Sequence, residues 1–201
     1  MNTERIEHDR FGDLTAEAHD EVDRMRVRLA PPINRSLAVL IDRLEAACDG
    51  PSDAINMAVT GGLGEAARDA SLLSEEQRRG RSDRYVRHLL HADPAGRFSV
   101  VSLVWGPGQF SPVHGHYTWC GYVVVAGQLH EESYVWIPDR KVAIQTDATD
   151  RHRGDLCFSH AGLEEIHRLG NRGSDCAVSV HVYGIDGKRV TSHVNRVVKS
   201  V

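Results

Sequence analysis

Two histidines one residue apart, His114 and His116, have the spacing in this chain that most directly suggests chemistry. They lie in the segment 108–127, which is rich in residues that favour β-strands. Side chains two residues apart on a strand share a face, so both imidazoles can aim at one point. Imidazole is a good ligand for Fe, Zn, Cu and Ni. Two ligands rarely complete a metal site, so a third ligand is expected elsewhere in the chain.

A second polar series, Ser179, His181 and Tyr183, occurs near the end of the chain and alternates with valines. On a strand these three side chains would line one face. If that face is buried, the polar groups need partners, and a Ser–His–Tyr relay would satisfy them and fix the tyrosine hydroxyl. If the strand lies at an edge, the same residues form a solvent-facing polar side. No acidic residue follows to orient the histidine, which argues against a nucleophilic triad.

Arg87 is the candidate for binding an acidic ligand. A planar guanidinium group holds a carboxylate through two parallel hydrogen bonds, which provide affinity and orientation together. Arg84 lies just before it, so the segment is basic in any case. Arg87 is therefore either a carboxylate ligand or a surface residue of an edge strand.

The composition of the 201-residue chain fits one domain, or one domain with a helical appendage. The net charge is −4 with both signs interspersed, which gives no electrostatic footprint for nucleic acid. No apolar run approaches the ~20 residues that span a bilayer, and the charged N-terminus lacks a signal peptide's apolar centre. The four cysteines form no C-x-x-C pair, so free thiols are expected. We expect a soluble, cytoplasmic protein that binds neither nucleic acid nor membranes.

The first part of the chain predicts a charged arm and then a helix. Residues 1–33 are highly charged and predict a solvated helix or arm. Asn34 is a plausible N-cap, and the Asp-Gly-Pro sequence at 49–51 would end the helix. Apolar residues recur between them at helical spacing, as on a helix buried on one face. These residues are Leu37, Leu40, Ile41, Leu44 and Cys48.

Three shorter helical pieces are expected to follow. Ser52 is suited to cap a second helix that runs through Val59 and is ended by the glycines at 61–62. A third piece is expected over 64–73. Residues 74–77, Ser-Glu-Glu-Gln, form a capping-box pattern for a fourth.

The rest of the chain is rich in β-formers separated by Gly, Pro and Asp, and short strands at such intervals predict an antiparallel barrel or jelly roll. The organisation expected is an arm over 1–33 and one domain over 34–201, with helices in 34–80 and the barrel in 84–201. Barrels of this size hold one small ligand or metal at the mouth. The expected strands cover 84–91, 97–105, 118–125, 130–137, 141–145, 154–159, 165–169, 176–183 and 189–198.

Several glycines and histidines resemble the two motifs of the cupin superfamily. The resemblance implies a small jelly-roll barrel with three histidine ligands, His114, His116 and His167. Cys120 stands where the first motif usually carries a glutamate ligand, and the second motif is two residues longer than usual before His167. The matching residues are Gly108, His114, His116 and Gly127 for the first motif, and Gly154, Gly162, His167 and Asn171 for the second.

The segment 84–184 is similar more specifically to the thiol dioxygenases, the cysteine dioxygenase family. The similarity rests on three runs: R-Y-V-R at 84–87, W-G-P-G at 105–108 and S-V-H-V-Y at 179–183. It implies that Fe(II) is the metal and that both atoms of O2 are transferred to the sulfur of a small thiol carboxylate. It further implies that Arg87 and Tyr85 bind the carboxylate, that Trp105 lines the pocket, and that the relay orients the substrate through Tyr183.

The resemblance gives two indications of the substrate. In the family, arginine at the position of Arg87 accompanies cysteine, and glutamine accompanies 3-mercaptopropionate, so Arg87 favours L-cysteine and cysteine sulfinate as product. The Gly-Ile sequence at 184–185 is closer to the bacterial mercaptopropionate enzymes. 3-Mercaptopropionate, or another mercapto-acid, is therefore the alternative substrate.

Cys120 is a candidate for a thioether bond to Tyr183. Counted back from Gly127, it falls where the animal enzymes carry a cysteine bonded to the tyrosine that matches Tyr183. Counted forward from His116, the positions differ by one residue. The alternative is a small buried cysteine without a chemical role.

Two other kinds of metal-binding cupin compete with the oxygenase. A non-catalytic sensor that binds a metal and a small acid needs only the three histidines. Such a sensor does not require Arg87 together with Ser179, His181 and Tyr183. An isomerase- or hydrolase-type cupin that uses Zn or Mn usually keeps the carboxylate ligand, whose position is taken here by Cys120.

Overall fold

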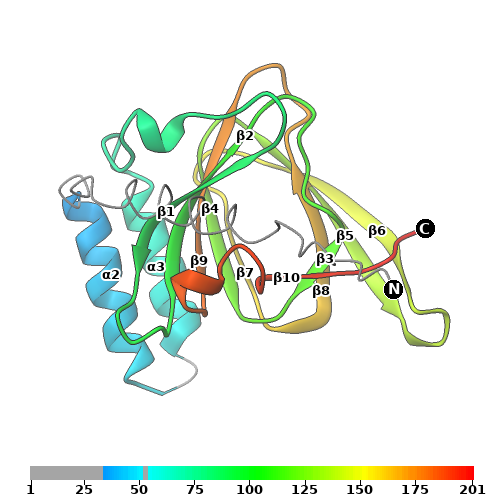
Figure 1. Cartoon of the computed structure of the whole chain (residues 1–201), viewed down its shortest axis with the longest axis horizontal. Helices are drawn as coiled ribbons and strands as arrows, with labels where there is room; N and C mark the ends of the chain where they lie inside the picture. The colour runs from blue at the N-terminus through cyan, green and yellow to red at the C-terminus, as the bar shows by residue number, and fades with distance from the viewer. Residues whose placement is uncertain (1–33, 52–53) are drawn as a thin grey trace, which may run out of the picture. The chain divides into compact units, whose positions relative to one another are not determined.

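The computed structural model describes residues 34–51 and 54–201, in which Asn34–Val201 form one compact unit (Figure 1). The predicted arm over 1–33 and the predicted cap at Ser52 lie outside the described residues. No helix in the described part of the chain is both long and apolar enough to span a membrane.

The first described helix, α2 (Arg35–Cys48), begins where the sequence predicts. The Asn34 side chain accepts hydrogen bonds from the backbone N–H groups of Ser36 at 2.7 Å and Leu37 at 3.3 Å, and so caps the helix. Its buried face contains most of the predicted apolar residues, with Ala47 fully buried and Cys48 only partly so. The buried residues are Leu37, Leu40, Ile41, Leu44 and Ala47.

The second helix, α3 (Ala54–Ala66), runs straight through the glycine pair that was predicted to end it. The separate helix predicted over 64–73 is therefore also wrong, because its beginning belongs to α3. Gly62 serves packing between helices instead, since a Cβ there would lie 2.6 Å from the Leu40 side chain of α2.

The predicted capping box at 74–77 is confirmed at the start of η2 (Glu76–Arg78). The backbone N–H of Ser74 donates to Gln77 Oε1 at 2.9 Å, and the N–H of Gln77 donates to Ser74 Oγ at 3.3 Å.

The remainder forms two five-stranded antiparallel sheets, which confirms the mainly β fold with an N-terminal helical portion. One sheet has the order β1-β2-β9-β4-β7, and the other has the order β10-β3-β8-β5-β6. Short 3-10 helices, η3 (Pro138–Arg140) and η4 (Gly187–Arg189), lie in the connections. The strands are β1 (Val86–Ala92), β2 (Ser99–Trp105), β3 (His114–His116), β4 (Cys120–Ala126), β5 (Leu129–Ile137), β6 (Val142–Arg151), β7 (Leu156–Ser159), β8 (Gly162–Gly170), β9 (Ala177–Tyr183) and β10 (Asn195–Val197).

Two predicted strands differ most from those in the structure. The strand predicted over 141–145 is only the start of β6, which pairs with β5 all the way from Val142 to Arg151. Its second half is polar and exposed, so hydrophobic pattern did not reveal it. The long strand predicted over 189–198 is wrong, because Asp186 caps η4 by accepting from the Lys188 N–H, and only β10 remains extended.

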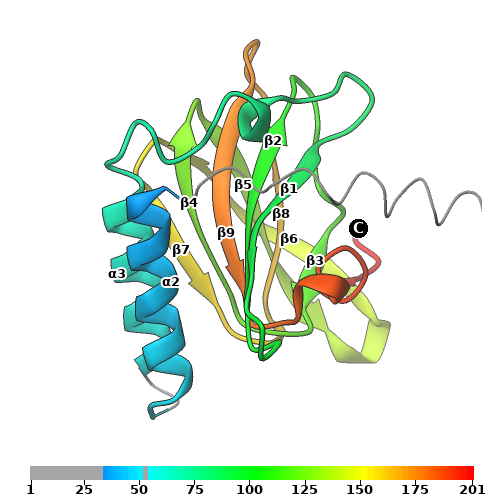
Figure 2. The ribbon, with the colours of Figure 1, turned by 60° about the vertical axis from the view of Figure 1, so that its left-hand side comes forward.

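Alternation along the strands divides the first sheet into two apolar layers. Val178, Val180 and Val182 of β9 pack in a cluster with residues of α2 and α3, and both helices cover this outer face (Figure 2). Ala177 and Tyr183 face the other way and pack with residues of both sheets, such as Leu169 of β8. The odd-numbered residues of β9 therefore point into the space between the sheets.

Candidate metal centre and adjoining cavity

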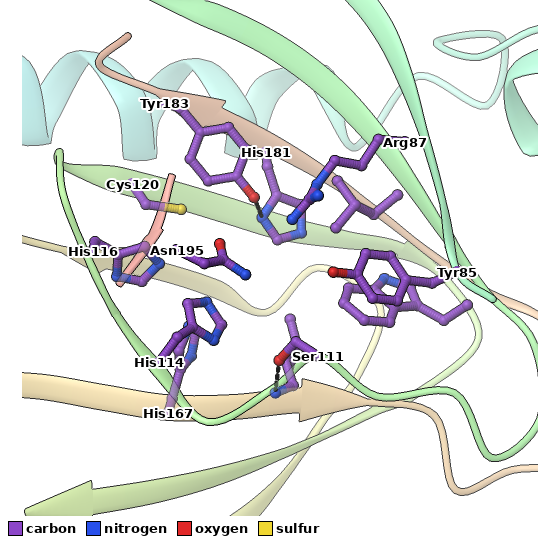
Figure 3. A pocket seen from close by; sticks show the side chains of 13 residues that line it. Tyr85, Arg87, Ser111, His114, His116, Cys120, His167, His181, Tyr183 and Asn195 are labelled. Carbon is purple, nitrogen blue, oxygen red and sulfur yellow. Dashed lines mark hydrogen bonds between the residues drawn. The ribbon is translucent and has the colours of Figure 1, made fainter. Parts of the chain in front are cut away.

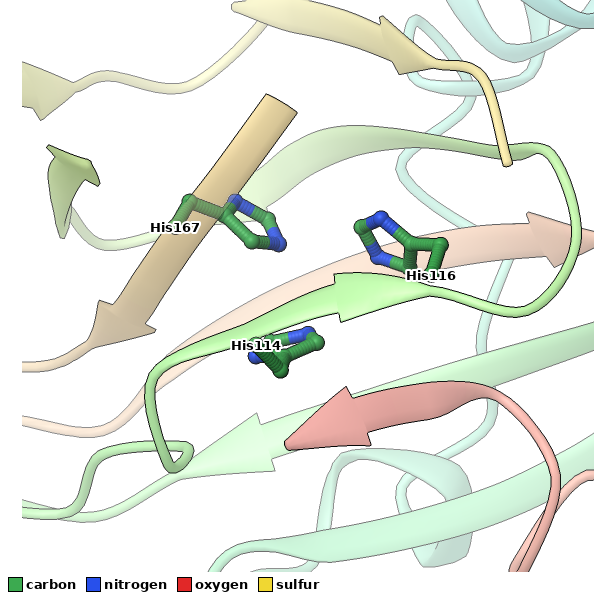
Figure 4. A group of neighbouring side chains, drawn as sticks. All are labelled: His114, His116 and His167. Carbon is green, nitrogen blue, oxygen red and sulfur yellow. The ribbon is translucent and has the colours of Figure 1, made fainter. Parts of the chain in front are cut away.

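The structure brings His114, His116 and His167 together between the two sheets (Figure 4). One nitrogen from each ring can be chosen so that all three lie within 4.8 Å of one another. The ring centroids are 5.1 Å apart for 114–116, 4.7 Å for 114–167 and 5.1 Å for 116–167. All three side chains are buried, so the cluster is a built feature of the interior and not a chance surface grouping.

An irregularity in the ladder between β3 and β8 aligns these histidines. His114 pairs with His167, whereas His116 pairs with Gly162. An advance of two residues along β3 therefore corresponds to five residues along β8. The extra residues before His167 in the sequence are accommodated in this stretch, which keeps His167 opposite His114. A Cβ on Gly115 would overlap with the Gly162 carbonyl oxygen, so the strands approach this closely only with glycine between the two histidines.

Hydrogen bonds orient two of the three imidazoles. His114 Nδ1 donates to the Pro112 carbonyl at 2.8 Å, and His167 Nδ1 donates to Glu131 Oε1 at 2.6 Å. Each bond leaves Nε2 as the nitrogen free to bind a metal. The buried Nδ1 of His116 has no hydrogen-bond partner within 34–51 and 54–201.

The electrostatics suit a cation held by neutral ligands. Burial lowers the pKa of His114 to about 3 and that of His116 to about 2, and in both cases the adjacent His167 adds to the effect. Both rings are therefore neutral at pH 7, the form of histidine that binds metals. Burial alone would raise the pKa of Glu131, but its hydrogen bond and charge interaction with His167, together with the Arg151 charge, hold it at about 2. Three buried imidazole nitrogens thus fit a divalent transition metal.

The predicted relay is also assembled, and Trp105 extends it. Trp105 Nε1 donates to Ser179 Oγ at 3.0 Å, Ser179 Oγ lies 2.8 Å from His181 Nε2, and His181 Nδ1 lies 3.1 Å from the Tyr183 hydroxyl. β9 lies between β2 and β4, and all three relay residues are buried. The edge-strand alternative for this series is therefore wrong.

Trp105 fixes the direction of the first bond in the relay, because an indole N–H can only donate. Ser179 accepts that bond and can then donate its own hydrogen to His181 Nε2. Burial lowers the pKa of His181 well below its usual value, so the ring is neutral, and the tautomer that accepts from Ser179 carries its hydrogen on Nδ1. His181 then donates to the Tyr183 oxygen, which leaves the Tyr183 hydroxyl hydrogen free to point elsewhere.

A cavity joins the histidine cluster to this relay (Figure 3). Its empty volume, counted up to its opening to solvent, is about 290 Å³. Of the residues predicted for the site, only Ser179 does not line it, because it lies behind His181. The lining residues are Tyr85, Arg87, Leu103, Trp105, Ser111, His114, His116, Cys120, His167, Leu169, His181, Tyr183 and Asn195.

Arg87 faces this cavity although it belongs to the edge strand β1. It pairs with Leu103 of β2, another lining residue, and its buried Nε has no hydrogen-bond partner among the described residues. Its guanidinium carbon lies 5.3 Å from the centre of the Tyr85 ring, and that ring stacks on Trp105 at 4.6 Å. Arg87 is only partly buried, but its Nε is buried without a partner in this part of the chain, and leaving a buried N–H unpaired is costly, which favours a ligand that could accept from it.

Cys120 and Tyr183 lie directly opposite each other on β4 and β9. Both side chains are buried and line the cavity, and opposite residues of an antiparallel pair have Cβ atoms roughly 5 Å apart. Burial raises the pKa of the Cys120 thiol well above its usual value.

Sequence reasoning missed three polar residues of the site, one of which is Ser111 in the lining of the cavity. Asn195 of β10 lines the cavity because it pairs with His116. Glu131 of β5 orients His167 from outside the cavity. The signal for Glu131 was two adjacent glutamates, Glu131 and Glu132, inside an expected strand, where alternation must turn at least one of them toward the interior.

Comparisons with known proteins agree with these features. The family model of cysteine dioxygenase type I matches residues 75–190. Cysteine dioxygenase type 1 from Danio rerio is 33% identical over 106 residues, 50% of this chain and 51% of that protein. The Homo sapiens protein of the same name is 31% identical over 103 residues, 50% of each chain. The chain thus spans about half the length of the curated relatives it matches.

Among solved structures, a Klebsiella pneumoniae protein with a double-stranded β-helix domain is 19% identical with a TM-score of 0.46, over 60% of this chain and 88% of that one. A match to more than half of the chain establishes the family on its own, so the chain belongs to the cysteine dioxygenase type I family.

Proposed function

We propose that this chain is a non-haem Fe(II) thiol dioxygenase, which adds both atoms of O2 to the sulfur of a small thiol carboxylate. The observation that carries the proposal is the meeting of the three-histidine cluster with Arg87 and Tyr183 in one cavity. Family membership supports the reaction class. Fe(II) held by His114, His116 and His167 would supply O2 activation and a site for the thiolate sulfur.

Arg87 would bind the substrate carboxylate. Arg87 lines the cavity, and its guanidinium group lies over the Tyr85 ring. The Tyr85 ring is held in place by stacking on Trp105. Two parallel hydrogen bonds to a carboxylate would fix the direction in which the thiol end of a short molecule points. The carboxylate of such a substrate would lie at Arg87 and its sulfur at the histidines, since both line the same cavity.

Tyr183 would orient the substrate from the neighbouring wall. The relay from Trp105 through Ser179 and His181 occupies the Tyr183 oxygen as an acceptor and leaves its hydrogen for donation into the cavity. Burial raises the pKa of Tyr183 well above its usual value, so the hydroxyl keeps this hydrogen at neutral pH. Tyr183 would therefore act as a fixed hydrogen-bond donor.

Apolar side chains of both sheets would exclude water from the reacting sulfur. Leu103 of β2 and Leu169 of β8 line the cavity, together with the ring of Trp105. Each is at most 2% exposed, so these walls are part of the protein core. Dry walls strengthen the interaction of Arg87 with an anion and limit side reactions of oxidised sulfur.

We propose L-cysteine as the substrate, with 3-mercaptopropionate or another mercapto-acid as the alternative. Arg87 would bind the carboxylate that these molecules share, and the family pattern links arginine at this position to cysteine. We also propose a cytoplasmic location, since all four cysteines are free and a reducing compartment preserves free thiols.

The test is O2 uptake by the iron-loaded protein with L-cysteine beside 3-mercaptopropionate, for the natural protein and for Arg87→Gln. Loss of a charge-assisted hydrogen-bond pair should cost about 2–3 kcal/mol, so kcat/KM for cysteine should fall by roughly 30- to 150-fold, and relatively less for the other thiol. Arg84→Gln is the matched control, because the Arg84 side chain is 69% exposed. If Arg87→Gln leaves kcat/KM unchanged for both thiols, the assignment of Arg87 to the carboxylate is wrong, and an unaltered preference between them would contradict the link between Arg87 and L-cysteine.

A further inference from the structure

We propose that Glu131 is a positioning residue of the metal centre, which places a negative charge one hydrogen bond behind His167 and thereby strengthens metal binding. The proposal rests on the proposed function only in that a divalent metal binds the three histidines. It concerns the affinity of that site, which can be measured without thiol or O2.

Glu131 is placed for this role by the pairing of β5 with β8. It lies on β5 two residues before Ser133, the residue that pairs with His167. Two residues along a strand restore the same face, so Glu131 and His167 project to the same side of the sheet. The Glu131 side chain is only 5% exposed, and its Oε1 lies 2.6 Å from His167 Nδ1. This is a short, charge-assisted hydrogen bond out of contact with solvent.

The second oxygen of the carboxylate is held by two further donors. Arg151 Nε of β6 donates to Glu131 Oε2 at 2.7 Å, and the Tyr122 hydroxyl of β4 donates to the same atom at 2.9 Å. Oε1 is therefore left to His167 alone among the described residues, and the carboxylate cannot rotate without losing both bonds. Tyr122 also stacks on His181 at 5.0 Å, so one rigid cluster connects the metal ligand with the relay.

The chemistry of the arrangement follows from charge. Three neutral imidazoles bring no negative charge to a divalent cation, and burial makes an uncompensated cation costly. A carboxylate that accepts the Nδ1 hydrogen makes the opposite nitrogen of the ring a stronger donor to a metal. Arg151 attracts the same carboxylate from the other side and draws part of this charge away from His167.

Glu132 provides a matched control next to Glu131. Both residues are 4% exposed, and both belong to β5. The Glu132 carboxylate contacts Arg172 at 2.9 Å, the Tyr134 hydroxyl at 2.8 Å and Arg168 at 3.5 Å, but no histidine in the described part of the chain. Loss of its charge disturbs a similar buried network without touching a metal ligand.

The test is Co(II) binding to the metal-free full-length protein, measured by competition with a chelator of known affinity, in the absence of thiol. Glu131→Gln keeps the size of the side chain and removes its charge, and should weaken Co(II) binding by about 10- to 100-fold. Glu132→Gln should change it by less than about 3-fold. Arg151→Gln releases the carboxylate from its competing cation and should leave Co(II) binding equal to or tighter than that of the natural protein.

The outcomes separate the possibilities. If Glu131→Gln and Arg151→Gln weaken binding equally, the cluster acts only as structural support and the proposal is overturned. Binding by Glu131→Gln within 3-fold of the natural protein also overturns it. If Glu131→Gln does not fold, Arg151→Gln still decides, because weaker binding by that variant contradicts the role of charge. Failure of the natural protein to bind Co(II) would remove the proposed function itself, and this inference with it.

Discussion

At the scale of single residues, the site combines groups whose charge states are set by burial and by neighbouring charges. Neutral His114 and His116 and the cationic Arg87 line one cavity, and the ionised Glu131 lies behind His167. The ligand to be bound must therefore bring negative charge for Arg87 and a thiolate or similar donor for a metal. A small thiol carboxylate meets both requirements with few atoms.

The pairing of Cys120 with Tyr183 leads to a prediction about covalent chemistry. The thiol and the tyrosine ring lie opposite each other in the cavity, so turnover with O2 as oxidant should join the sulfur to the ring carbon beside the hydroxyl. The S–H bond and one ring C–H bond break as the C–S bond forms, and O2 takes up the two protons and two electrons to give hydrogen peroxide. The expected result is a loss of two hydrogens in intact-protein mass after incubation with iron, thiol and O2. Cys120→Ser should show no such loss, and an unchanged mass for the natural protein would reject the thioether.

Which site residues could be predicted depended on local spacing. A spacing of two residues within one strand shows that side chains share a face. This holds for His114 and His116, and for Ser179, His181 and Tyr183. Glu131 and Asn195 could not be assigned in this way, because their roles depend on which strands become neighbours and in what register. His167 was reached only through its resemblance to a family motif, since no period within the chain connects it to the other two histidines.

At the scale of elements, Gly121 controls how closely α3 packs on β4. A Cβ at this position would overlap with the Val59 side chain of α3. Gly121→Ala should therefore lower the free energy of unfolding by about 1–3 kcal/mol, measured by urea denaturation. Gly50→Ala, where the nearest atom would be 3.5 Å from the new Cβ, should have little effect.

A double variant tests the cause of this loss. Val59→Ala makes room for the added methyl group, so Gly121→Ala combined with Val59→Ala should cost less than the sum of the two single changes. Strict additivity would show that Gly121 is needed for a reason other than contact with α3.

The elements that differed from prediction share a physical reason. The glycines at 61–62 predict a helix stop, but tertiary packing on Leu40 outweighs their low helix propensity. The polar half of β6 was not predicted because hairpin hydrogen bonds with β5, and not burial, hold it extended. The order of the strands in each sheet also could not be predicted from the hydrophobic pattern of the sequence, since β3 and β8 become neighbours only in the folded chain.

At the scale of the whole molecule, an ion cluster links the β1–β2 hairpin to the end of α2. Arg97 donates to both oxygens of buried Asp93, at 2.8 and 3.0 Å, and to Asp49 at 2.6 Å. The hydrogen bonds from Arg97 hold the pKa of Asp93 at about 2, although burial acts in the opposite direction.

This cluster predicts how stability depends on pH. Because the pKa of Asp93 is lower in the folded state than the usual 3.8, its contribution is complete above about pH 4 and is lost as the pH falls toward 2. Asp93→Asn should lower the free energy of unfolding by about 1–3 kcal/mol at pH 7 and should flatten the pH dependence between pH 4 and 2. Urea denaturation across this range measures both effects. Asp49→Asn, whose side chain is 73% exposed, should cost less than about 1 kcal/mol.

The central claim is that the three histidines hold an iron at which O2 is added to a thiol, and isotopic labelling of the product tests it most directly. The iron-loaded protein is incubated with L-cysteine, or with 3-mercaptopropionate, under ¹⁸O2, and the product is analysed by mass spectrometry. We expect a sulfinate in which both oxygens on sulfur are labelled, and no product from His167→Ala. A product that carries one labelled oxygen or none, or a disulfide alone, would contradict the account.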